Sequence, residues 1–276
     1  MQFVNSWALV VLACCSAGPA RAQLEILTNA APQCVFAAAA QNIPVTFHNP
    51  DAGEFAGEIR TRLIQTTSAT AVQLGDQAWK KLQVLPGQTV LESAALDFPA
   101  VKAETRFLVQ WLENSNHVIG TTEVRVYPAN LLAELKPLLG EETLGVLDPN
   151  HELKPLLKQN GAAFVDLGEM SLEEFSGKLA IIGPFRDKTQ MREGLARSLK
   201  VLASRRVAVV WLLPPPEKRA QPAPSFYSVP FGTNAVVVAQ AEMVSQLPEN
   251  PQAQLNLIYF CKQALQPQPS VLDPQP

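Results

Sequence analysis

The spacing of hydrophobic residues along the chain changes near residue 127. From Gln23 to Tyr127 short apolar stretches alternate with polar residues at a period of two, so that Phe107, Val109 and Trp111 share one face. This alternation is typical of strands that have one buried and one exposed face. We expect about seven strands here, at residues 34–38, 43–49, 56–65, 81–85, 89–96, 105–112 and 118–127.

Turn residues separate these strands, as at Asn49-Pro50-Asp51 and Pro86-Gly87-Gln88. Seven short strands without a helical period predict an all-β, immunoglobulin-like sandwich over residues 23–127. The cysteine pair and intervening Trp of antibody domains are absent. In its pattern the stretch resembles the immunoglobulin-like accessory modules of bacterial surface and secreted proteins.

After Tyr127 the pattern becomes helical and then alternates between strands and helices. Residues 128–139 predict a short apolar helix within a linker over 128–142, with Leu131, Leu132 and Leu135 on its buried face. Beyond it we expect strands at 144–147, 162–167, 179–182, 207–213 and 235–239, and helices at 151–160, 189–204 and 252–265. This alternation predicts a second domain over 143–266, an α/β flavodoxin-like three-layer fold with a parallel sheet.

The most apolar of these strands is 207–213, which ends in three prolines, Pro214 to Pro216. A continuous apolar run of this length predicts a strand buried on both faces of the sheet. A long loop from Pro214 to Pro230 follows it.

The composition of the two terminal segments indicates that neither belongs to these domains. The apolar run 3–17 followed by Ala20-Arg21-Ala22 is typical of a signal peptide over residues 1–22, which predicts export to the periplasm or beyond the cell. Alternatively, Val11-Leu12-Ala13-Cys14 is a lipobox, and Cys14 carries a lipid anchor. The Pro-rich tail, 267–276, is expected to be disordered.

The charge composition of the chain argues against two classes of partner. The net charge is −3 and no long run of one sign occurs, which argues against a surface for nucleic acid or for an anionic membrane. No further segment is expected to cross a membrane. Removal of the signal peptide leaves Cys34 and Cys261, which could pair; the favoured interpretation is two small buried apolar side chains.

Residues 143–265 resemble the class I glutamine amidotransferase-like fold, in the branch that includes the trehalose-utilisation-like domains. The matching pieces cover a little under half of the chain: FSGKLAIIGPF at 175–185, VAVVWLL at 207–213, FGTNAVVVAQ at 231–240 and NPQAQLNLIYF at 250–260. Catalytic members of the family carry a Cys nucleophile after the fourth strand and a His and an acid after the fifth.

This chain departs from that pattern at the positions that carry the chemistry. Trp211 or Leu212 stands where the nucleophile would be, and apolar side chains cannot attack a carbonyl carbon. The prolines that follow lack the backbone N–H groups of an oxyanion hole, and no histidine follows His151. The resemblance therefore implies a degenerate domain, and we predict that the protein is not an enzyme and has no catalytic residues.

Other chemistry has little support in the sequence. The three histidines, His48, His117 and His151, are scattered and lack ligand spacing, so no metal site is predicted. No glycine-rich phosphate loop occurs, so no cofactor is predicted.

One candidate ligand site remains. The carboxyl ends of parallel strands form the usual crevice for ligands in such a sheet. Here these strand ends carry the candidates Asp148, Asn150 and His151 after the first strand and Gly183, Phe185 and Arg186 after the third. A structural explanation competes, in which the acidic and amide side chains cap helices and Arg186 is a surface charge.

The favoured hypothesis is an exported, non-catalytic binding or assembly protein of the cell envelope, with an unknown protein or glycan as its partner. The alternative is a carbohydrate-binding or carbohydrate-processing protein that uses the strand-end crevice. A third hypothesis is a purely structural envelope component.

Overall fold

The computed structural model describes residues 23–27, 31–114, 117–191, 193–214, 226–231 and 234–266. The predicted signal peptide, the lipobox at Cys14, the tail and most of the loop 214–230 lie outside the described residues. The described part is a mixed α/β structure rich in sheet. The chain divides into two compact units, Met1–Ala31, Asn42–Ala94 and Leu108–Glu123 forming one, and Pro32–Gln41, Ala95–Phe107 and Val124–Pro276 forming the other.

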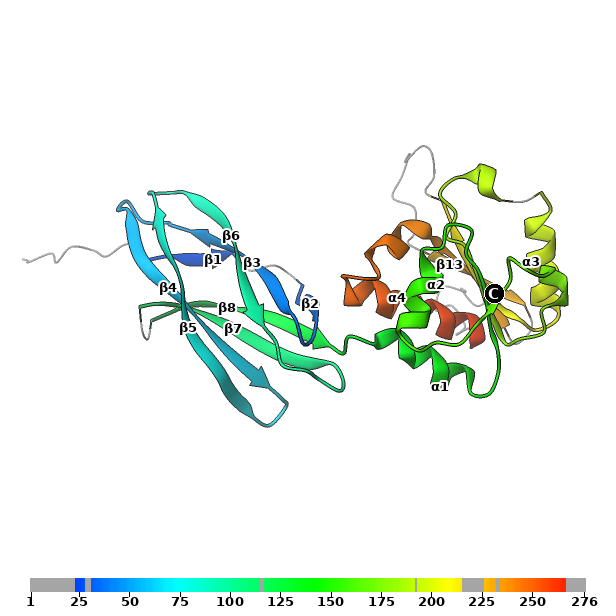
Figure 1. Cartoon of the computed structure of the whole chain (residues 1–276). Helices are drawn as coiled ribbons and strands as arrows, with labels where there is room; N and C mark the ends of the chain where they lie inside the picture. The colour runs from blue at the N-terminus through cyan, green and yellow to red at the C-terminus, as the bar shows by residue number, and fades with distance from the viewer. Residues whose placement is uncertain are drawn as a thin grey trace, which may run out of the picture. The chain divides into compact units, whose positions relative to one another are not determined.

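The described residues before the linker form strands and no helix, in two sheets (Figure 1). The smaller sheet has the order β1-β3-β6 and the larger β2-β8-β7-β4-β5. Their bounds are β1 Glu25–Leu27, β2 Gln33–Phe36, β3 Ala40–His48, β4 Phe55–Thr66, β5 Ala71–Val84, β6 Thr89–Asp97, β7 Thr105–Glu113 and β8 His117–Tyr127.

Two of these strands differ from the sequence prediction. Strand β1 was not predicted, and β5 begins ten residues before the predicted strand 81–85. Most of β5 is exposed, because it is an edge strand that pairs with β4 alone. Its first residues alternate only over Val72-Gln73-Leu74, which is too short a run to predict a strand.

Aromatic side chains from both sheets meet in the core of the first unit. Phe47 of β3 lies edge-on to Trp111 of β7, with ring centroids 5.8 Å apart, and Trp79 of β5 lies 5.2 Å from Trp111. Trp111 and Phe47 are fully buried. Edge-to-face packing of this kind stabilises a core beyond the area that it buries.

The predicted linker helix is a 3₁₀ turn, η1 (Leu131–Glu134), followed by a five-residue helix, α1 (Leu135–Leu139). Leu131, Leu132 and Leu135 are buried, as their spacing predicted. The helix ends at Gly140, whose φ of 65° lies in the left-handed region that glycine tolerates.

The remaining strands form one six-stranded sheet in the order β10-β9-β11-β12-β14-β13. Five strands are parallel, and only β13 runs antiparallel, beside β14. Strand β12 lies between β11 and β14, so the apolar run is interior to the sheet, as predicted. The bounds are β9 Leu144–Leu147, β10 Val165–Asp166, β11 Leu179–Ile182, β12 Ala208–Leu213, β13 Phe226–Phe231 and β14 Asn234–Gln240.

Helices cover both faces of this sheet. Buried residues of α2 and α4 pack against one face and those of α3 against the other, and Figure 1 shows α3 on the opposite side from α2 and α4. The helical segments are α2 Leu153–Gln159, η2 Leu172–Glu174, η3 Lys188–Gln190, α3 Leu195–Ser204, η4 Ala241–Gln246 and α4 Pro251–Leu265.

Three predictions in this region were wrong in detail. The expected helix 189–204 begins only at Leu195, because Gly194 has a φ of 85° and separates it from the 3₁₀ turn η3. The expected strand 162–167 is reduced to β10, and the end of the expected loop 214–230 forms β13. Strand β13 contains Pro230, and a proline within an apolar segment argues against a strand unless the strand lies at an edge.

Candidate functional site

A pocket of about 270 Å³ lies at the carboxyl ends of β9, β10 and β11. Neighbouring parallel strands end at the same edge of a sheet, which brings the loops that follow them together. The lining residues are Leu147, Asp148, Pro149, His151, Lys154, Asp166, Gly168, Glu169, Phe185, Gln190 and Leu195.

Asp148 is the most buried polar residue of this pocket, with 1% of its surface exposed. It follows β9 directly, and its Oδ2 accepts hydrogen bonds from the backbone N–H groups of Leu153 (2.8 Å) and Lys154 (2.9 Å). The carboxylate thus satisfies donors in the first turn of α2, which have no partner within the helix. Its other oxygen, Oδ1, is buried and has no hydrogen-bond partner among the residues that the structure describes.

Lys154 and Asp166 form an ion pair beside Asp148. Lys154 Nζ lies 2.6 Å from Asp166 Oδ2, and the lysine side chain is only 10% exposed. The backbone N–H of Gly168 donates to Asp166 Oδ1 at 2.8 Å. The Lys154 side chain, and to a lesser degree the Gly168 N–H, lower the pKa of Asp166, so this carboxyl stays ionised at neutral pH.

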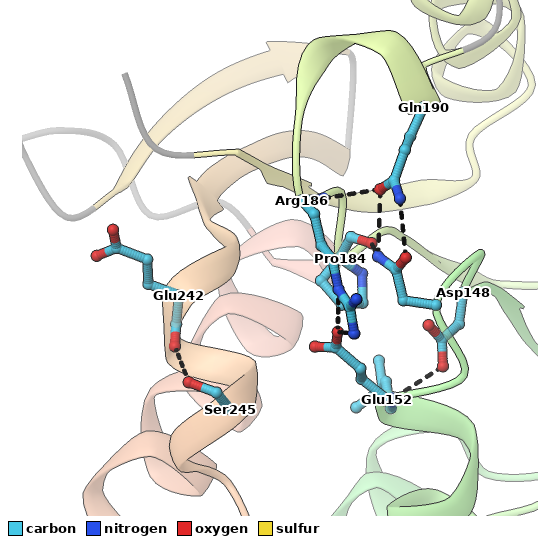
Figure 2. A network of polar contacts seen from close by, with 9 residues as sticks. Asp148, Glu152, Pro184, Arg186, Gln190, Glu242 and Ser245 are labelled. Carbon is cyan, nitrogen blue, oxygen red and sulfur yellow. Dashed lines mark hydrogen bonds and ion pairs between the residues drawn. The ribbon is translucent and has the colours of Figure 1, made fainter. Parts of the chain in front are cut away.

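A second polar network joins the loop after β9 to the loop after β11 (Figure 2). Asn150 donates to Pro184 O at 2.9 Å and accepts from Gln190 Nε2 at 2.9 Å. The backbone N–H of Arg186 donates to Gln190 Oε1 at 2.8 Å, and the Arg186 guanidinium donates twice to Glu152 Oε1 (2.9 and 2.7 Å).

The structure places the six candidate ligand residues in two groups. Asp148, His151 and Phe185 line the pocket, whereas Asn150, Gly183 and Arg186 are not among its lining residues. Asn150 and Arg186 belong to the network that joins the two loops. The ligand-binding roles of all six remain predictions.

Gly183 has a structural reason to be glycine. Its φ is 106°, and a Cβ at this position would lie 2.6 Å from the carbonyl oxygen of Leu212 in β12. A larger side chain at residue 183 would therefore collide with the main chain of the neighbouring strand.

Sequence analysis missed Lys154, Asp166 and Glu169, which contribute most of the charge in the pocket. Asp166 and Glu169 lie at and just after the end of β10. The rule that selected the ends of the first and third strands, applied to the second, would have found both. The burial of Lys154 on the sheet side of α2 has no such signal, because lysine is seldom buried.

The end of β12 presents apolar groups. Trp211 is partly buried, and its indole Nε1 has no hydrogen-bond partner; Leu212 is buried, and Leu213 is partly buried. Within the described ranges, no three His, Cys, Asp or Glu side chains are grouped so that they could hold a metal ion. No helix in the described part of the chain is both long enough and apolar enough to span a membrane.

Comparison with known proteins identifies no family. No family model matches the chain, and no curated protein matches it. Among solved structures, an alkylpurine DNA glycosylase AlkC from Pseudomonas fluorescens, bound to DNA containing an abasic site analog, aligns with 39% of this chain and 31% of its own, at 14% identity and a TM-score of 0.30.

Two glycosidase structures align over a similar share of the chain. A β-glucosidase from Listeria innocua in complex with isofagomine aligns with 39% of this chain and 17% of its own, at 16% identity and a TM-score of 0.29. A GH3 β-glucosidase from Bifidobacterium adolescentis aligns with 38% of this chain and 17% of its own, at 12% identity and a TM-score of 0.28. The chain thus matches less than a third of the length of each protein, and similarities at these TM-scores carry no argument about fold or function.

Proposed function

We propose that the protein is an exported, non-catalytic binding protein that holds a small ligand at the carboxyl ends of β9, β10 and β11. In this proposal residues 143–266 form a degenerate amidotransferase-like domain of flavodoxin-like topology, and residues 23–127 an immunoglobulin-like sandwich. The order of the parallel strands supports the topology: numbered along the chain, they lie in the order 2-1-3-4-5. Export is proposed from the composition of residues 1–22.

The end of β12 supports the absence of catalysis. Trp211, Leu212 and Leu213 cannot act as nucleophiles, and the residues that follow in the sequence are prolines. Without a backbone N–H, a proline cannot stabilise an oxyanion.

The buried Oδ1 of Asp148 is the observation that carries the binding function. A buried carboxylate oxygen without a partner destabilises the folded state, by about 1–3 kcal/mol or more for a charged group. A ligand that donates a hydrogen bond to this oxygen removes that penalty. The pocket that Asp148 lines has room for such a ligand.

Thermal-shift screening of the purified protein tests the proposal. A ligand that binds only the folded state at 100 times its Kd stabilises that state by about 2.7 kcal/mol, which raises the melting temperature measurably. We expect at least one small hydrogen-bond donor to stabilise the wild type, and to stabilise Asp148→Asn much less. Asp97→Asn, which removes the same charge from an exposed position in β6, is the matched control and keeps the full shift.

Two outcomes would overturn the proposal. If no compound in a broad panel of small polar molecules raises the melting temperature of the wild type, the pocket is not a binding site. If the protein releases ammonia from glutamine in a turnover that Asp148→Asn abolishes, the protein is an enzyme.

A further inference from the structure

The ionisable residues of the pocket carry an excess of negative charge. Three carboxylates, Asp148, Asp166 and Glu169, line it together with one ammonium group, that of Lys154, and the imidazole of His151. With His151 neutral, the lining has two more negative than positive charges.

The single ammonium group is already paired. Lys154 Nζ lies 2.6 Å from Asp166 Oδ2, and this contact neutralises Asp166 rather than Asp148. Both N–H groups that stabilise Asp148 bind Oδ2, which leaves Oδ1 without a hydrogen-bond donor from the described part of the chain. Among the described residues, no ammonium or guanidinium group therefore pairs with the inner carboxylate, Asp148.

A cationic donor should bind Asp148 Oδ1 more strongly than a neutral hydroxyl group does. Any hydrogen bond to an ionised carboxylate is stronger than one between neutral groups, and a donor that carries positive charge adds the Coulomb attraction between opposite charges. Removing the partner of a buried charge is also much more destabilising than removing the partner of a neutral group. The free energy gained at Asp148 is therefore largest for a donor that carries positive charge.

The rest of the pocket lining favours a ligand whose remaining part is small and apolar. Leu147, Phe185 and Leu195 contribute apolar walls and are almost fully buried. A volume of about 270 Å³ admits a small ligand. A sugar ring has polar groups around its whole perimeter, and those that face these apolar walls would lose hydration without gaining a hydrogen bond.

We infer that the ligand is a small organic cation, with one ammonium group on a short apolar body. Its ammonium group donates to Asp148 Oδ1, and its apolar part packs on Leu147, Phe185 and Leu195. Because Oδ1 is buried, the side chains of the lining must move before a ligand can contact it. Glu169 and His151 line the same pocket and are exposed. This inference rests on the proposed function, that this pocket binds a ligand.

Isothermal titration calorimetry with matched probes tests the inference. The probes are 2-phenylethylamine and cyclohexylmethylamine, their hydroxyl counterparts 2-phenylethanol and cyclohexylmethanol, and the sugars glucose and trehalose. We expect the wild type to bind at least one amine ten-fold or more tightly than the corresponding alcohol. We expect that affinity to fall as sodium chloride is raised from 20 to 500 mM.

Variants then locate the site. Asp148→Asn retains an acceptor for the first turn of α2, so it should fold, and should bind the amine at least ten-fold more weakly. Glu169→Gln changes an exposed side chain and should weaken binding by two- to five-fold, while Asp97→Asn should bind as the wild type does. Melting temperatures of all three variants show whether each is folded.

The outcomes separate this inference from the proposed function. If alcohols or sugars bind as tightly as amines and Asp148→Asn abolishes their binding, the pocket is a ligand site but the ligand class is wrong. If amines bind Asp148→Asn and the wild type equally well, the inferred contact is wrong. If none of the probes binds the wild type, the inference fails, and the thermal-shift panel decides whether the proposed function fails with it.

Discussion

Asp148 is hydrogen-bonded to the main chain of Lys154 and not to its ammonium group. Oδ2 of Asp148 accepts from the Lys154 backbone N–H at 2.9 Å, while the lysine side chain reaches Asp166 at 2.6 Å. Lys154 thus binds Asp148 through its backbone N–H and Asp166 through its ammonium group. Because the ammonium group pairs with Asp166, it does not bind the unpartnered Oδ1 of Asp148. The stability of α2 and the proposed ligand contact both depend on this arrangement.

Replacement of Asp148 separates its structural role from its charge. Asp148→Ala removes the acceptor of two backbone N–H groups in α2, and should lower the free energy of unfolding by about 1–2 kcal/mol more than Asp148→Asn does. Asp148→Asn should lower it by clearly less, because asparagine caps helices about as well as aspartate. Urea unfolding of the two variants measures the difference, and an equal loss in both would show that the carboxylate charge, not the capping bond, stabilises α2.

Replacement of Lys154 should have a pH-dependent effect. The Lys154 side chain holds the pKa of Asp166 below its usual value of 3.8. A carboxyl whose pKa is lowered by folding contributes stability above its unfolded pKa, and that contribution is lost as the pH falls through the lower, folded value. Lys154→Met should therefore lower the free energy of unfolding by about 1–2 kcal/mol at pH 7, and this loss should become smaller below about pH 4.

Chemical unfolding at pH values from 2 to 7 measures this deficit. Arg186→Met is the control, because it breaks a more exposed pair, in which the Arg186 side chain is 67% exposed. Its cost should be no more than about 0.5 kcal/mol. A Lys154→Met deficit that stays constant down to pH 2 would mean that lost packing, and not the ion pair, is the cause.

Gly183 should tolerate no side chain. Gly183→Ala places a Cβ 2.6 Å from Leu212 O at a φ of 106°, so we expect a loss of about 2 kcal/mol or more. Gly75→Ala in β5 meets nothing within 4 Å and should change the stability by less than about 0.5 kcal/mol. Thermal unfolding of both variants is the measurement, and a Gly183→Ala protein as stable as the wild type would contradict the close approach of these two strand ends.

The two described cysteines should differ in reactivity. Both are free thiols, Cys34 partly exposed and Cys261 fully buried. Burial raises the pKa of Cys261 to about 12, and because the thiolate is the reactive species, iodoacetamide at pH 8 should leave it unmodified in the folded protein. Cys34, whose pKa is also raised by burial, should be labelled slowly.

Peptide mass mapping after timed labelling distinguishes the two thiols. Labelling in 6 M guanidinium chloride should modify both and serves as the control. Modification of Cys261 in the folded protein at the rate of Cys34 would contradict its burial in α4.

Much of the fold could be predicted because burial leaves a local pattern. The run 207–213 has no polar residue, so it predicted an interior strand, and β12 does lie between two others. Strand β13 left no such pattern, because an edge strand that contains Pro230 forms only where β14 is available to pair with it. The sequence shows a glycine at residue 194 but does not show that it interrupts the helix, because this depends on the φ that the surrounding structure imposes.

Part of the candidate site could also be predicted from the sequence. Strand ends indicated Asp148, His151 and Phe185, since strand boundaries follow from the hydrophobic pattern. Gly183 and Arg186 are also at a strand end, but one lies against β12 and the other forms an ion pair with Glu152. A strand end therefore indicates which loop a residue occupies, not the direction of its side chain.

The sequence by itself determined which segments are apolar enough to be buried, where glycine and proline interrupt them, and that prolines, not a nucleophile, directly follow the strand at 207–213. Only the tertiary structure decided that Lys154 pairs with Asp166, twelve residues away, and that one oxygen of Asp148 is left without a donor. The physical reason is that burial follows from the composition of a local segment, whereas a hydrogen bond or ion pair depends on positions set within ångströms by the packing of several segments.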